Sequence, residues 1–137
     1  MTTNRLLILT LLLAGALGSC SPDGAPIAEA QYASKIVGNW QGTVGDQRET
    51  ISFGADGGFT SQVRRRGFIS DTLNQGVTGA IRGTWAIQGK SITLNIGSAE
   101  DVRVINSVIT STIETFKPNE IVVKSATGGT ATFVRAL

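Results

Sequence analysis

The side chains that most often carry out catalysis are nearly absent from this sequence. Its 137 residues include no histidine and a single cysteine, Cys20. Imidazole general-base chemistry, zinc sites built on nitrogen and sulfur, and disulfides within the chain are therefore excluded. The adjacent acids Glu100 and Asp101 supply too few oxygens for Ca²⁺, which takes about six to eight. We expect no enzyme activity, no metal site and no cofactor.

Charge is concentrated at one place, the run Arg64, Arg65 and Arg66. Such a run could contact lipid headgroups, lipopolysaccharide phosphates or an acidic partner. It could equally be a solvated strand end or loop that discourages edge pairing. In a strand, Arg65 would face opposite to its two neighbours, which disfavours a single patch. The 12 basic and 10 acidic residues of the chain nearly balance, so we expect no nucleic-acid partner.

The N-terminus has the three parts of a secretory signal. Arg5 is the positive residue, Leu6 to Leu17 form an apolar run, and Gly18 and Ser19 are small residues at a cleavage region. The run has about a dozen residues, whereas a membrane-spanning helix needs about 20. We therefore expect a signal peptide over residues 1–19 that is removed.

The residues around Cys20 point to a lipid anchor. Leu17-Gly18-Ser19-Cys20 resembles a bacterial lipobox, which implies a diacylglyceryl group on the thiol and cleavage just before it. Acyl chains together form a stable anchor. The alternative is an ordinary secreted protein with a leftover cysteine. Ser21, where inner-membrane lipoproteins carry Asp, favours the outer membrane of a bacterial envelope. We assign residues 20–35 to the lipidated N-terminus and tether, and 36–137 to one folded domain.

The remainder of the chain must supply a scaffold, and its patterns are those of short strands. From Ile36 to Val44 and again at Ile51 and Phe53, apolar residues alternate with polar ones. Asp56-Gly57 between two apolar runs is a strong hairpin signal. Residues 64–76 break the alternation and predict a long loop.

A second hairpin is predicted around Gln88-Gly89-Lys90, and turns follow near residues 117–120 and 127–129. Residues 28–34 favour a helical turn or two. The total is about eight strands in sequential hairpins, with no segment long enough for a crossover helix. The prediction is an all-β fold, a small antiparallel up-and-down β-barrel of about eight strands, because closure removes exposed edges.

Several short motifs give this pattern a family resemblance. Gly38-Asn39-Trp40 at the first strand is similar to the Gly-x-Trp signature of lipocalins. The motifs that follow in order look like small bacterial lipocalin-like lipoproteins: Phe53-x-x-Asp56-Gly57-x-Phe59, Gly83-Thr84-Trp85-x-Ile87, Ile92-Thr93-Leu94 and Phe133-Val134-Arg135. The resemblance covers about residues 36–137. It implies a barrel with a central apolar cavity, closed at one end by Trp40 with Arg135 across its ring.

Two functions remain open. The first is a membrane-anchored, lipocalin-like barrel that binds a small apolar ligand. The second is an envelope interaction protein with a packed barrel and no ligand, whose loops dock on a protein partner or inhibit an exogenous enzyme. Trp40 and Trp85 could line a ligand site or simply belong to the core. A cavity favours the first function and a filled interior favours the second.

Overall fold

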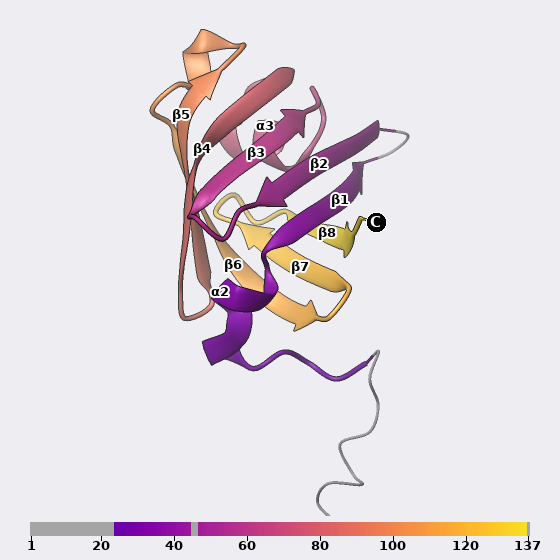
Figure 1. Cartoon of the computed structure of the whole chain (residues 1–137). Coiled ribbons are helices and arrows are strands. Elements are labelled where there is room, and N and C mark those ends of the chain that lie inside the picture. The colour runs from indigo at the N-terminus through magenta and orange to yellow at the C-terminus, as the bar shows by residue number, and fades with distance from the viewer. Residues whose placement is uncertain (1–23, 45–46, 137) are drawn as a thin grey trace, which may run out of the picture.

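Eight strands form a closed barrel in which each strand pairs with the next one along the chain (Figure 1). The computed structural model describes residues 24–44 and 47–136, so the predicted signal peptide and Cys20 lie outside the described residues. β1 pairs with β2 on one side and with β8 on the other, and every pairing is antiparallel. The expected fold class, a small up-and-down β-barrel, is confirmed.

The elements are short and follow one another closely. The strands are β1 Gly38–Val44, β2 Gln47–Phe53, β3 Gly58–Val63, β4 Gly79–Gln88, β5 Ser91–Ala99, β6 Val108–Lys117, β7 Glu120–Ser125 and β8 Thr130–Arg135. The helical elements within the described ranges are η1 Glu29–Gln31, α2 Tyr32–Lys35, α3 Phe68–Leu73 and η2 Val102–Val104. None of the helices in the described ranges is long and apolar enough to cross a membrane.

The alternation of buried and exposed side chains along the strands explains how the barrel acquires an apolar interior. Along β6, buried and exposed residues alternate from Val108 to Ile113, and the same holds along β3. Successive side chains of a strand point to opposite faces, so one row fills the interior and the other meets solvent. The turn between β2 and β3 is built as predicted: the Asp56 side chain accepts a hydrogen bond from the Gly58 amide (2.9 Å), and Gly57 has a φ of 88°.

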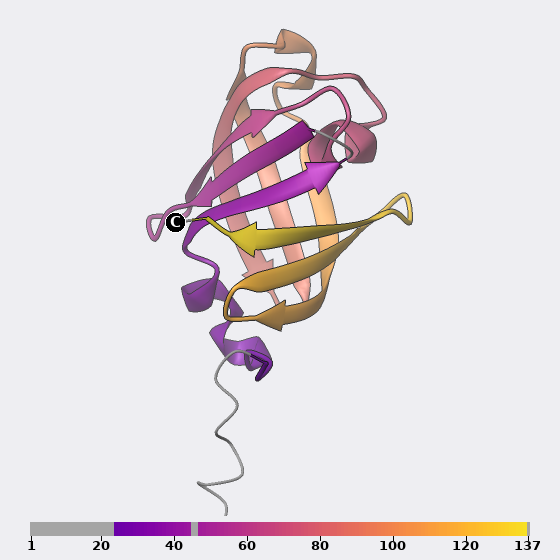
Figure 2. The same ribbon diagram turned by 90° about the vertical axis from the view of Figure 1, so that its right-hand side faces the viewer.

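Helical segments cover the two ends of the barrel, which Figure 2 shows from the side. η1 and α2 lie beneath one end, and α3 lies at the opposite end. The prediction of a helical turn near residues 28–34 agrees with η1 and α2. The prediction of a loop over residues 64–76 was wrong in part, because it contains α3. Ile36 was also misplaced, since it follows α2 and lies before β1.

One core fills the barrel and extends under both helical ends. Tyr32 from α2, Ile69 from α3 and Val104 from η2 are buried in it together with the inward side chains of all eight strands. These three small helices are therefore integral parts of the core, because each contributes a buried apolar side chain, whereas η1 contributes none.

Candidate functional site

An apolar cavity of about 40 Å³ lies inside the barrel. Ten of its lining residues are apolar and one is a serine: Ile36, Trp40, Ile51, Phe53, Phe68, Ile92, Leu94, Ser111, Ile121, Val123 and Phe133. They come from six strands, from the α2 end and from α3. The two ends of the barrel determine what can reach this cavity.

Aromatic rings seal the end beneath which α2 lies. Trp40 is only 1% exposed, and its indole nitrogen donates a hydrogen bond to the Ile36 carbonyl (2.7 Å). The Phe116 ring packs edge-on against Trp40, with centroids 6.0 Å apart, and stacks on Tyr32 at 5.1 Å. Such arrangements contribute about 0.5–1.5 kcal/mol per pair beyond their buried area.

Arg135 completes this seal from the last strand. Its guanidinium carbon lies 4.3 Å from the centroid of the Trp40 ring, and the two residues are register partners between β1 and β8. The guanidinium also donates to three main-chain carbonyls, those of Pro118 (3.1 Å), Val37 (3.2 Å) and Lys35 (2.8 Å). These are the positions at which the lipocalin resemblance placed Trp40 and Arg135. We call this end, with Tyr32, Trp40, Phe116 and Arg135, the sealed end.

The opposite end is covered by residues 64–77, which connect β3 to β4 and contain α3; we call them the lid segment. Phe68, the first residue of α3, lines the cavity. Its ring packs edge-on against Phe133, which also lines the cavity, with centroids 5.8 Å apart. Phe68 is half-buried, so its ring lies between the cavity and solvent. The lid segment therefore covers one way into the barrel.

A buried carboxylate holds the lid segment in place. Glu49 on β2 is 3% exposed and accepts hydrogen bonds from the amides of Phe68 (2.7 Å) and Ile69 (3.4 Å). Gly67 allows this approach, since a Cβ there would lie 2.6 Å from a Glu49 carboxylate oxygen. Any larger residue at position 67 would push the carboxylate away from the two amides.

Burial changes the acidity of this carboxyl group. Removal from water raises the pKa of Glu49 from 4.5 to about 7, while the two amide hydrogen bonds lower it and Asp71 raises it further. Within the described residues, the one ion pair joins Arg103 to Asp101, so no described cation pairs with Glu49. Near neutral pH the group therefore changes charge inside the fold.

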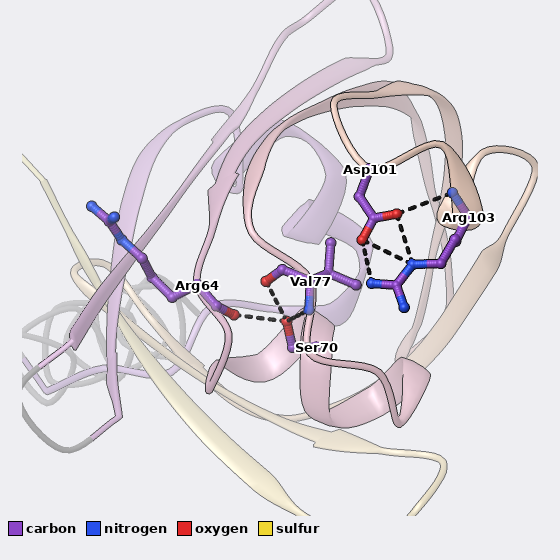
Figure 3. Close-up of polar contacts among 5 residues, drawn as sticks. All are labelled: Arg64, Ser70, Val77, Asp101 and Arg103. Atoms are coloured by element: carbon purple, nitrogen blue, oxygen red, sulfur yellow. Dashed lines mark hydrogen bonds and ion pairs between the residues drawn. The ribbon is translucent and has the colours of Figure 1, made fainter.

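Ser70 ties the two ends of the lid segment together (Figure 3). Its hydroxyl oxygen lies 2.7 Å from the Arg64 carbonyl and 2.9 Å from the Val77 carbonyl, and it accepts from the Val77 amide (3.2 Å). The Asp101–Arg103 pair drawn in the same view lies on the loop after β5. Arg103 is well exposed, so that pair contributes little to stability.

The arginine run lies at this same lidded end. Arg64, Arg65 and Arg66 are all exposed and follow the end of β3. The Arg64 side chain donates to the Arg48 carbonyl (3.1 Å). Trp85 is half-buried against Phe53, is not among the cavity-lining residues, and packs against the core.

Sequence reasoning missed Glu49, Phe68 and Ser111. Glu49 has the same parity on β2 as Ile51 and Phe53, so the alternation itself placed it inward, where a carboxylate is unexpected. Ser111 is 4% exposed, and its hydroxyl oxygen is buried with no hydrogen-bond partner among the described residues. The described residues contain no cluster of three or more potential metal ligands.

Comparison with known proteins finds similar folds among solved structures but no match in sequence. No protein-family model matches the sequence, and no curated protein matches it at a significant level. A lipocalin-like protein from Bacteroides uniformis has a similar crystal structure, with a TM-score of 0.51 and 13% identity over 74% of this chain and 99% of that one. An uncharacterized protein from Bacteroides eggerthii is similar with a TM-score of 0.47 and 12% identity, over 74% and 99% of the two chains. The first similarity shows that the barrel is lipocalin-like.

Proposed function

We propose that this protein binds a small, mostly apolar molecule inside its barrel and has no enzyme activity. The observation that carries the proposal is the interior cavity, whose wall consists of ten apolar residues and Ser111. Ligand sites in proteins are concave and mostly apolar, with a few polar groups that fix orientation. The unpartnered hydroxyl of Ser111 is such a group, because a buried hydroxyl gains from any partner that a ligand provides.

The size of the cavity determines how a ligand enters. A cavity of about 40 Å³ holds a few water-sized atoms, whereas ligand pockets usually measure about 300–1,000 Å³. A ligand of several carbon atoms must therefore displace a side chain. Phe68 is the side chain to move, because the sealed end is fixed by Arg135 and its three carbonyl partners. We place the entrance under the lid segment.

We also propose that the chain is anchored in a bacterial envelope by lipid on Cys20, with the outer membrane as its site. The tether reaches the barrel at the sealed end, where the Ile27 amide donates to the Phe116 carbonyl (2.8 Å). An anchor there leaves the lidded end pointing away from the membrane. Cys20→Ala should leave an uncut, unlipidated precursor and release the domain from membranes. A variant that stays with membranes after a high-salt wash would show that the anchor is elsewhere.

Native mass spectrometry of the protein purified from its own host tests ligand binding directly. We expect a bound small molecule that dissociates on activation. Val123 faces the cavity, and Val134 on the neighbouring strand is exposed. Val123→Phe should therefore lose the molecule by filling the cavity, at a cost of about 1–3 kcal/mol in stability, whereas Val134→Phe should retain it. Equal retention by both variants would place the molecule outside the barrel.

The same small volume favours a second function. If no ligand displaces Phe68, the barrel is a packed scaffold that docks on an envelope protein or an exogenous enzyme. The exposed arginines of the lid segment are then the contact surface. A ligand-free wild-type protein, together with loss of partner binding in a triple Arg64, Arg65 and Arg66 to Ser variant, would support this alternative.

A further inference from the structure

The lid segment is attached to the barrel interior in an unusual way. Most contacts between a surface segment and a core are apolar, whereas here the first two amides of α3 donate to a single carboxyl group that belongs to the barrel wall. That group, Glu49, lies on the same inward row as Ile51 and Phe53, both of which line the cavity. The attachment point of the lid therefore adjoins the proposed ligand site.

We propose that Glu49 operates the lid segment as a gate, closed while the carboxyl is protonated and released when it ionises. The proposal rests on the proposed ligand site, because the gate regulates entry to it. Protonated, the carboxyl is neutral and fits the apolar interior while still accepting hydrogen bonds from the lid. Ionised, it is a charge without a counter-ion inside the barrel, and lifting the lid returns it to water.

The surrounding charges support this direction. On α3, Asp71 acts on Glu49 as a like charge and favours its protonation. Arg48 and residues 64–66 are exposed cations near this end, but none forms an ion pair with Glu49. Gly42 is the register partner of Glu49 on β1, and neither β1 nor β3 carries a charged residue. The charged residue of β8, Arg135, lies at the sealed end, and Asp46 lies outside the described residues. Nothing described compensates a negative charge on Glu49 except the two lid amides.

The difference in the pKa of Glu49 between the closed and open lid determines how strongly pH shifts the lid equilibrium. Glu49 has a pKa of about 7 with the lid closed, and an ordinary value near 4.5 once it is exposed. Closure is then fully favoured below about pH 4.5 and loses its advantage as the pH rises toward 7. If the full pKa difference of Glu49 is coupled to lid opening, the ratio of open to closed forms rises by as much as about 300-fold over this pH range. The gate opens on the alkaline side.

Amide hydrogen exchange between pH 5 and pH 8, corrected for intrinsic rates, tests the gate without any ligand. The sample is the protein expressed from the full-length sequence, in the form that cells produce. The reporters are the amides of Asp71 and Gln75, which donate to the carbonyls of Gly67 (2.9 Å) and Ser70 (3.1 Å). The Arg135 amide, bonded to the Asn119 carbonyl at the sealed end, is the internal reference. We expect protection of the two lid amides to fall at least tenfold and that of Arg135 to stay constant.

Two variants separate the gate from a general effect of pH. Glu49→Gln keeps the size and one acceptor oxygen but cannot ionise, so its lid amides should be equally protected at both pH values. Glu114→Gln, which neutralises an exposed carboxylate on β6, should behave as the wild type does. A flat wild-type profile, or a Glu49→Gln profile like that of the wild type, overturns the proposal. If Glu49→Gln fails to fold, the wild-type profile alone decides. A rise in the opening constant of the lid amides with its midpoint between about pH 6 and 8 supports the gate, and any other midpoint overturns it.

This experiment also keeps the two proposals apart. A pH-dependent lid in a protein that never carries a small molecule would mean that the gate exists and the ligand-binding function is wrong. A bound molecule with a lid that ignores pH would leave ligand binding intact and remove the gate.

Discussion

The two ends of the barrel are covered by different means, and the difference indicates which one opens. At the sealed end, the rings of Tyr32, Trp40 and Phe116 pack on one another, and the Arg135 guanidinium lies over Trp40 and donates to three main-chain carbonyls. At the lidded end, a six-residue helix depends on one buried carboxyl group and one hydroxyl. A permanent closure and a releasable one therefore exist in the same small barrel.

The largest expected effect is at the sealed end. Trp40→Ala removes a fully buried indole together with its contacts to Phe116 and Arg135. We expect the free energy of unfolding to fall by about 3–5 kcal/mol, as for other large core aromatics. Urea unfolding followed by circular dichroism measures it. A loss below about 1 kcal/mol would show that the rings do not hold this end together.

The next effect belongs to the lidded end and depends on pH. Because the pKa of Glu49 is raised from 4.5 to about 7, its contribution to stability is complete below pH 4.5 and is lost as the pH rises through 7. The wild type should therefore be less stable at pH 8 than at pH 5, by up to about 2.5 kcal/mol. Glu49→Gln should remove this difference. An identical pH dependence in the variant would assign it to other groups.

A smaller effect tests the contact that closes the barrel. Arg135→Ala should cost about 0.5–2 kcal/mol, through the lost cation–π contact and the lost packing of its stem. In the double variant with Trp40→Ala, the losses should not add, because the guanidinium has no ring left to lie on. Additivity within about 0.5 kcal/mol would mean that the two side chains are energetically independent despite their 4.3 Å separation.

The smallest effect has the opposite sign and lies between the two ends. Ser111→Ala removes a buried hydroxyl that has no described partner. We expect the ligand-free protein to gain about 1 kcal/mol in stability, since an unsatisfied polar group is costly to bury. A loss of stability would reveal a hydrogen bond made by this hydroxyl in solution.

These regions also differ in how far the sequence predicts them. Alternation predicts the strands and the Asp56-Gly57 turn because both depend on local patterns. The lipocalin resemblance placed Trp40 and Arg135, which are neighbours only after closure. The helix α3 was missed because six residues between Gly67 and Asn74 show no helical period, and its attachments to Glu49 and Ser70 are tertiary. Glu49 was missed because a charged residue inside a strand is ordinarily assigned to the solvent face.

Methyl NMR of the protein with added 1-hexanol tests the central claim, that the barrel interior takes up a small apolar molecule. The account predicts shifts at the cavity-lining methyl groups of Ile51, Ile92 and Leu94, and none at the exposed Val102 and Val108. The two valines serve as an internal control for unspecific association. Shifts confined to the exposed valines, or no shifts up to the solubility of the alcohol, would contradict ligand binding and favour the packed barrel.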